Sequence, residues 1–216
     1  MPAEIKVVPV GDGAVGKTAY NFHIHYHDSI LKNFHSIHAA FGGEYPESLL
    51  RVADNWQGSY ISNNLQCSLS VWDTSGADGH ARIRAMSYPN TDVFLVLFSV
   101  VDGISFINVK QRWIPEIRKA LPFASALLVG TKNDLRDTGK REVSQERAKD
   151  LVSELGLLGY VECSAKYGTG VREVLDAVLR HVHDTNNNNT DDGTNASENS
   201  ENDTDNTSET SEEYSE

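Results

Sequence analysis

The sequence predicts an α/β fold in which a mostly parallel sheet is covered by helices on both faces. Short apolar runs alternate with longer mixed segments over residues 1–185, which is the pattern of β-strands separated by helices. The apolar runs are nearly continuous and do not alternate with polar residues, as expected for strands buried on both faces. A glycine-rich motif follows the first run directly, where such folds turn from a strand into a helix.

Apolar runs predict the strands in chain order. The longest uninterrupted run, Val93 to Phe98, is far shorter than the roughly 18 to 20 residues needed to span a bilayer. A last strand is expected just before Cys163. The other predicted strands are Ile5–Val10, Leu69–Trp72, Asp92–Val101 and Ala124–Gly130.

The segments between these runs predict helices. Ser144 is a typical helix start and Gly156 a typical stop, so they bound one helix. In the last helix, apolar residues recur at intervals of three and four, which predicts an amphipathic stripe facing the core. The predicted helices are Lys17 to about Ala40, Ile104–Leu121, Ser144–Leu155 and Val171–His183.

The charge of the chain is concentrated at its C-terminal end. The 216 residues carry a formal net charge of −12, of which residues 186–216 contribute −10 and residues 1–185 only −2. The acidic Asn/Ser/Thr-rich segment 186–216 has almost nothing to bury and is predicted to be disordered, which leaves one domain over residues 1–185. This distribution gives no electrostatic reason to bind nucleic acid or an anionic membrane.

Two further features indicate the compartment. The first ten residues lack the apolar stretch of a secretory signal. Two cysteines, Cys67 and Cys163, are too few for a disulfide scaffold and fit a reducing environment. We therefore expect a cytoplasmic protein.

The glycine-rich motif matches the pattern G-x-x-x-x-G-K-[ST] in full. Its glycines let the backbone form a nest whose N–H groups point at phosphate oxygens, and the following helix adds the positive end of its dipole. Lys17 is expected to reach the β- and γ-phosphates, and the Thr18 hydroxyl to ligate Mg²⁺. The predicted phosphate-binding residues are Gly11, Asp12, Gly13, Ala14, Val15, Gly16, Lys17 and Thr18.

Two later segments indicate which nucleotide binds. Thr131-Lys132-Asn133-Asp134 follows a buried strand, and open α/β sheets bind ligands at the carboxyl ends of their strands. A carboxylate there can accept hydrogen bonds from both the N1–H and the exocyclic amine of guanine, a pair that adenine does not present. Cys163-Ser164-Ala165-Lys166 follows the last strand and is placed to offer a backbone N–H to guanine O6.

In this order, these motifs resemble small GTPases of the Ras superfamily, and specifically the Rho/Rac family. Rho-like features are Trp72-Asp73-Thr74, Ser87–Phe94, Trp113–Arg118 and the threonine at Thr131. The resemblance covers roughly residues 3 to 183 and implies a P-loop GTPase fold that binds GTP or GDP with Mg²⁺. It implies an intracellular signalling switch, acting on the actin cytoskeleton.

The resemblance also implies roles for individual residues. Asp73 would hold Mg²⁺ through a water, Gly76 would sense the γ-phosphate, and Lys132 would pack along the base. The implied base pocket also includes Phe41, Thr131, Asp134, Ser164 and Ala165, with Asp134 as the guanine reader.

The chain departs from this family after the Asp73-Thr-Ser-Gly76 motif. Family members carry there a glutamine that orients the attacking water, whereas Ala77 has no donor or acceptor. Removing one positioned polar group from a transition state commonly costs about 3 to 4 kcal/mol, a factor of roughly 10² to 10³. We expect slow hydrolysis and assign no catalytic residue; the alternative is that Asp78 or His80 holds the water.

The first switch region also departs from the family. Between Thr18 and Trp72 the chain is about fifteen residues longer than the family pattern. Alignment from Glu44-Tyr45 puts Ser48 at the metal-ligating threonine of the family, whereas counting back from Trp56 puts Arg51 there. A serine keeps the metal ligand and an arginine removes it; Ser48 is preferred.

The insertion is rich in histidine. Pairs one helical turn apart could hold a metal ion, but no cysteine or tight carboxylate cluster completes a site. A solvated, extended first helix is therefore favoured over a metal centre. The histidines are His23, His25, His27, His35 and His38.

The expected partners are effector proteins, exchange factors and GTPase-activating proteins, bound by a monomer. No C-a-a-X motif or polybasic run precedes Glu216, and an acidic tail would be repelled by an anionic leaflet, so we expect no prenyl anchor. The competing hypothesis is a nucleotide-independent scaffold that acts through the insertion and the tail. The intact Gly11–Thr18 motif and Asp134 disfavour it.

Overall fold

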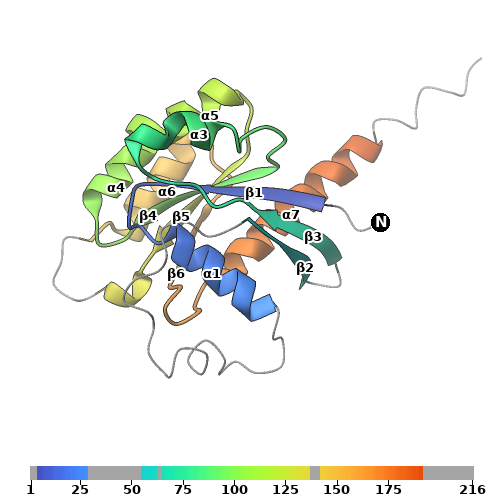
Figure 1. The fold of residues 1–216 in the computed structure, drawn as a ribbon, viewed down its shortest axis with the longest axis horizontal. Helices are drawn as coiled ribbons and strands as arrows, with labels where there is room; N and C mark the ends of the chain where they lie inside the picture. The colour runs from blue at the N-terminus through green and yellow to red at the C-terminus, as the bar shows by residue number, and fades with distance from the viewer. Residues whose placement is uncertain (1–3, 29–54, 63–64, 137–141, 192–216) are drawn as a thin grey trace, which may run out of the picture.

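The computed structural model describes residues 4–28, 55–62, 65–136 and 142–191. Within them, six strands form one sheet in the order β2-β3-β1-β4-β5-β6 (Figure 1). β2 runs antiparallel to β3, and all other neighbours are parallel, which confirms the predicted mostly parallel sheet. The strands are β1 (Glu4–Val10), β2 (Trp56–Ser62), β3 (Leu65–Val71), β4 (Val93–Ser99), β5 (Ala126–Thr131) and β6 (Tyr160–Cys163).

Helices cover both faces of this sheet, as predicted. α1 (Lys17–Asp28) and α7 (Val171–Asp191) pack on one face, where Tyr20 and Val174 are fully buried. The other face is covered by α4 (Gly103–Asn108), the π-helical turn η2 (Val109–Trp113), α5 (Ile114–Ala120) and α6 (Gln145–Leu155). The remaining short elements are the 3₁₀ turns η1 (Asp78–His80) and η3 (Asn133–Leu135) and the helix α3 (Ala81–Ala85).

The strand predictions hold for β1, β4 and β5 but fail for β2 and for the first part of β3. β1, β4 and β5 lie where the apolar runs predicted them, with ends that differ by one or two residues. β2 was not predicted, and β3 begins at Leu65 instead of Leu69. β2 is an edge strand in which Tyr60 is buried and Ile61 is 57% exposed, so it has no continuous apolar run. An edge strand needs only one buried face, and this weakens its sequence signal.

The predicted ends of α6 are confirmed. The Ser144 hydroxyl accepts a hydrogen bond from the Arg147 N–H at 3.3 Å, which satisfies one of the orphan donors of the first turn. Gly156 follows the helix with φ of +60°, a left-handed conformation that favours glycine. Both signals are local, and this explains why the sequence could show them.

The helix predicted over Ile104–Leu121 is interrupted. Helical structure runs from Gly103 to Ala120, but its middle turn, η2, is a π-helix. A π turn accommodates an extra residue within an otherwise α-helical segment. The Asp102 carboxylate caps the start by accepting from the N–H groups of Ile104 and Ser105 at 3.0 and 3.3 Å.

The outer helices differ from their predicted ends. α7 continues to Asp191, eight residues past the predicted end at His183 and into the segment predicted to be disordered. Contacts four residues apart support this extension: the Thr185 hydroxyl donates to the His181 carbonyl at 2.9 Å. The predicted part of the first helix after Asp28 lies outside the described residues. Among the helices described, none combines the length and apolar character needed to cross a membrane.

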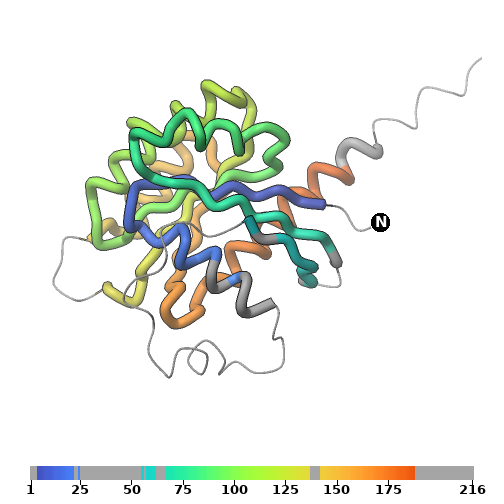
Figure 2. Tube along the Cα trace, in the orientation of Figure 1, coloured from blue at the N-terminus to red at the C-terminus, as the bar shows by residue number. Residues whose placement is uncertain are grey.

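The carboxyl ends of the parallel strands meet at one edge of the sheet. In the Cα trace, β1 runs between β3 and β4, both of which follow it by more than fifty residues in the sequence (Figure 2). β5 continues the sheet in parallel beside β4, so the loops after β1, β3 and β5 start from the same edge. Such an edge is where α/β sheets bind ligands.

Candidate nucleotide-binding site

The loop from Gly11 to Gly16, between β1 and α1, folds as a backbone nest. Gly11, Ala14 and Gly16 have φ of +149°, +61° and +107°. A Cβ on Gly11 would lie 2.3 Å from the Leu97 carbonyl oxygen of β4, so only glycine fits there. Left-handed residues interspersed with ordinary ones turn successive N–H groups into a concavity that binds anions. The predicted phosphate loop therefore has the geometry that phosphate binding requires.

Lys17 lies across this loop. Its ammonium group donates to the carbonyl oxygens of Gly11 at 2.7 Å and Asp12 at 2.6 Å, and the residue is buried. Burial lowers the pKa of Lys17 to about 8, although the Asp73 and Asp12 carboxylates act in the opposite direction. Phosphate oxygens beside this ammonium would offset its burial, because opposite charges favour the charged form.

The two described candidates for Mg²⁺ ligation contact each other. The Thr18 hydroxyl at the start of α1 donates to the Asp73 carboxylate, after β3, at 2.9 Å. The Thr74 N–H donates to the other Asp73 oxygen at 3.0 Å and helps to fix this carboxylate. A hydroxyl and a carboxylate beside a phosphate loop are the hard oxygen donors that Mg²⁺ prefers, so these residues fit the ion.

The predicted base-side segments lie at the same edge of the sheet. The buried Thr131 hydroxyl donates to the carbonyls of Val15 at 2.5 Å and Phe98 at 3.0 Å, which ties the end of β5 to the phosphate loop. Lys132 has φ of +59°, and its ammonium group donates to the Ala14 carbonyl at 2.7 Å. Lys132 therefore links the segment after β5 to the phosphate loop, through a contact between residues 118 positions apart in the sequence.

The two segments predicted to read guanine are neighbours as well. Asp134 lies half-buried in η3, and Thr131 pairs in register with Cys163 of β6. Ser164 is buried and its N–H donates to the Thr169 carbonyl at 2.8 Å, which shapes the loop containing Ala165. The structure thus places these segments side by side; their contact with a base stays a prediction.

Several predicted residues are not placed. Phe41, Ser48 and Arg51 lie outside the described residues, so the choice between Ser48 and Arg51 stays open. His35 and His38 also lie outside them. His23, His25 and His27 belong to α1, but their side chains are not among those described.

Gly76 packs directly on the phosphate loop. A Cβ on Gly76 would come within 2.5 Å of the Gly11 carbonyl oxygen and the Asp12 carbonyl carbon. The neighbouring Ala77 is exposed. The two residues considered as substitutes for glutamine have other partners: Asp78 pairs with Arg112 at 2.6 Å, and the His80 Nδ1 lies 2.8 Å from the Ser75 hydroxyl.

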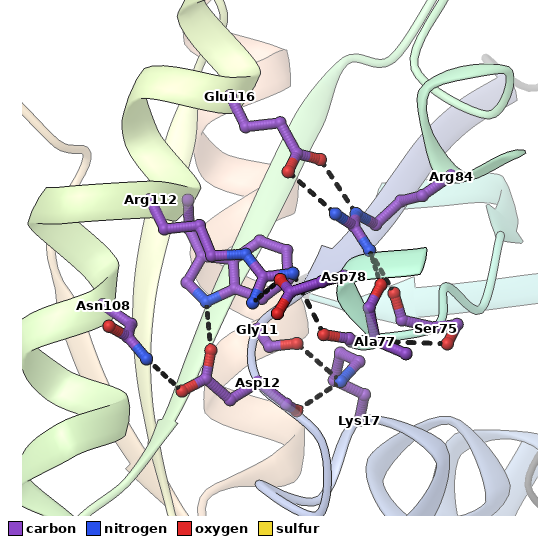
Figure 3. A network of polar contacts seen from close by, with 12 residues as sticks. Gly11, Asp12, Lys17, Ser75, Ala77, Asp78, Arg84, Asn108, Arg112 and Glu116 are labelled. Carbon is purple, nitrogen blue, oxygen red and sulfur yellow. Dashed lines mark hydrogen bonds and ion pairs between the residues drawn. The ribbon is translucent and has the colours of Figure 1, made fainter. Parts of the chain in front are cut away.

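A polar network that the sequence did not reveal supports the phosphate loop and the segment Ser75–Asp78, called the Gly76 segment below (Figure 3). Asp12 accepts hydrogen bonds from the Asn108 amide at 2.6 Å and from the Trp113 indole N–H at 2.8 Å. Arg84, whose side chain is fully buried, donates twice to Glu116 at 2.8 Å. Burial raises the pKa of Glu116, but the hydrogen bonds from Arg84 and Tyr88 outweigh it, so the pKa lies below its ordinary value.

Comparison with known proteins agrees with this geometry. A family model described as the Ras family matches residues 6–184. The chain is also 34% identical over 214 residues to the GTP-binding protein RHO5 of Saccharomyces cerevisiae (strain ATCC 204508 / S288c), an alignment that covers 82% of this chain. It spans 65% of that relative, slightly less than two thirds of its length. The chain therefore belongs to the Ras family of small GTPases, and its similarity to a Rho protein confirms the Rho-type resemblance of its motifs.

Proposed function

We propose that this protein is a guanine-nucleotide-binding switch that takes GTP and GDP with Mg²⁺. The observation that carries the proposal is the phosphate nest of Gly11–Gly16, with the Lys17 ammonium lying across it. Thr18 and Asp73 would hold the ion, which would neutralise phosphate charge. Asp134 would select guanine at the same edge of the sheet.

The first experiment is the mass analysis of nucleotide that copurifies with the protein, followed by titration with GTP, GDP and ATP in Mg²⁺ buffer. We expect about one guanine nucleotide per chain and no competition by ATP. Folded protein that binds neither GTP nor GDP at millimolar concentration would refute the proposal. That result would favour the nucleotide-independent scaffold.

Replacing Asp134 by asparagine should reduce the preference for guanine. An amide cannot accept two hydrogen bonds from the N1–H and the exocyclic amine at once, because its nitrogen is a donor. The loss of one hydrogen bond made by a charged group predicts about 1.5–3 kcal/mol, or roughly a tenfold to hundredfold weaker affinity for GTP. Competition between GTP and ATP measures the change. An unaltered ratio would remove Asp134 from this role.

We further propose that hydrolysis is slow because Ala77 cannot orient water. Ala77→Gln should raise the single-turnover rate of GTP hydrolysis by roughly 10² to 10³, as estimated for one positioned polar group. Asp78→Asn and His80→Gln test the alternative that one of these side chains, which contact Arg112 and Ser75, holds the water; that alternative predicts a further loss of the wild-type rate in one of them. Equal rates for wild type and Ala77→Gln would mean that another group positions the water.

The cellular setting follows from the same proposal. We propose a cytoplasmic monomer that binds effector proteins and regulators, with the actin cytoskeleton as the expected target of a Rho-type switch. Ile83 and Met86, next to the Gly76 segment, are 68% and 76% exposed and support a contact surface for such partners. Affinity capture with GTP-loaded and GDP-loaded protein would identify partners that bind only one form.

A further inference from the structure

Two arginines bind the segment that follows Asp73, and they donate hydrogen bonds to three successive backbone carbonyl groups. Arg84 donates to the carbonyls of Ser75 at 2.6 Å and Ala77 at 3.1 Å. Arg112 donates to the carbonyl of Gly76, between them, at 3.1 Å. The three peptides between Ser75 and Asp78 therefore each have their oxygen bound by a guanidinium group. Figure 3 shows Arg84 and Arg112 beside this segment.

These contacts fix the two peptides that flank Gly76. A trans peptide is planar, so the carbonyl of Ser75 and the N–H of Gly76 belong to one rigid unit. Arg84 sets the orientation of that unit, and Arg112 sets the orientation of the next one. Glycine is the residue with the greatest backbone freedom. Fixing both neighbouring peptides therefore removes freedom that Gly76 would otherwise have.

Arg112 is itself held from several sides. Its guanidinium lies 4.2 Å from the centre of the Trp113 ring and pairs with Asp78 at 2.6 Å. Both Arg112 and Trp113 belong to the π turn η2, and π turns are frequent at functional sites. The Arg112 side chain is 26% exposed, so its loss threatens folding less than the loss of the fully buried Arg84 side chain.

The same helical segment also holds the phosphate loop. Asn108 at the end of α4 and Trp113 at the end of η2 both donate to the Asp12 carboxylate. One face of this segment thus contacts the phosphate loop through Asp12 and the Gly76 segment through Arg112. The helical segment formed by α4 and η2 therefore helps to set the position of the phosphate loop relative to the Gly76 segment.

We propose that Arg112 is a positioning residue of the nucleotide site. It holds the peptide that follows Gly76, while Arg84 holds the peptide that carries the Gly76 N–H, and the two contacts together keep Gly76 in place against the phosphate loop. The inference rests on the proposed function and on the role that the family resemblance implies for Gly76, whose N–H would meet the γ-phosphate of GTP. The β-phosphate and the base of GDP do not depend on that N–H. Arg112 therefore contributes selectively to the binding of the triphosphate.

The test compares how fast a slowly hydrolysed GTP analogue and GDP dissociate, both carrying a fluorescent group. Arg112→Gln keeps a polar side chain but removes the guanidinium. We expect the analogue to leave about tenfold faster, equivalent to about 1.4 kcal/mol, and GDP to change less than twofold. Arg112→Lys should recover part of the loss, because an ammonium can still donate to one carbonyl.

Lys110→Gln is the matched control, because it removes one positive charge from the same turn. Lys110 pairs with Glu154 of α6 and lies on the exposed side of η2. Equal acceleration of both nucleotides by Arg112→Gln would reduce Arg112 to a structural role, and no acceleration of either would overturn the inference. A wild-type protein that binds neither nucleotide would instead refute the proposed function.

Discussion

Replacing Lys17 by alanine is expected to weaken the binding of GTP by roughly 10² to 10⁴ while leaving the protein folded. The ammonium group lies across the phosphate loop and would contact both the β- and the γ-phosphate. Hydrogen bonds between charged groups contribute about 1.5–3 kcal/mol each. Losing two of them predicts a fall in affinity of roughly 10² to 10⁴.

Titration with a fluorescent, slowly hydrolysed GTP analogue, alongside fluorescent GDP, would measure this fall, with circular dichroism to verify that the variant is folded. Lys149→Ala provides the control, because Lys149 is an exposed lysine on α6, remote from the phosphate loop. It should bind GDP as the wild type does. A folded Lys17→Ala protein with wild-type affinity would show that the loop does not bind phosphate in the proposed way.

Arg84→Met is expected to lower the free energy of unfolding by about 3–5 kcal/mol, the range for breaking a buried ion pair from one side. Its buried guanidinium makes four hydrogen bonds, two to Glu116 and two to the carbonyls of Ser75 and Ala77. Methionine fills similar volume but donates none. The Glu116 carboxylate would lose both hydrogen bonds from Arg84 and keep the one from the Tyr88 hydroxyl, at 2.6 Å.

Urea denaturation of both proteins would measure the difference. Lys110→Met is the control, since the Lys110 and Glu154 side chains are about half exposed and such surface pairs contribute about 0.2–1 kcal/mol. If Arg84→Met shifts the unfolding free energy no more than the control does, the Arg84 network does not stabilise the fold.

The parts of the site that are local in sequence could be predicted from it. Gly11–Thr18 forms its nest within eight consecutive residues, and Ser144 and Gly156 act on the turns beside them. The sequence order of Asp73, Lys132 and Ser164 also sufficed to predict that they lie at one site. Each of them follows a parallel strand, and all such strands end at one edge of the sheet.

The supporting network could not be predicted in the same way. The contact between Asp12 and Trp113 joins residues 101 positions apart, and that of Arg84 with Glu116 joins residues 32 apart. Each pair depends on which face of a helix points inward, and a π turn changes that face. β2 was missed for a related reason, because the antiparallel partner of β3 buries only one side.

The π turn η2 makes the length of this helical segment more critical than its side chains. An α-helix advances by about 100° per residue, so five residues of ordinary α-helix would leave Asn108 and Trp113 about 140° apart. The wider π turn brings residues five apart to the same face, and both side chains therefore reach Asp12. The number of residues and the π turn have to match, because a change in one alone would put Trp113 out of phase with Asn108. Exchanges at the exposed positions Lys110 and Gln111 leave that phase unchanged. Homologous chains with the same coupling between loops should therefore preserve the residue count here even where the amino acids differ.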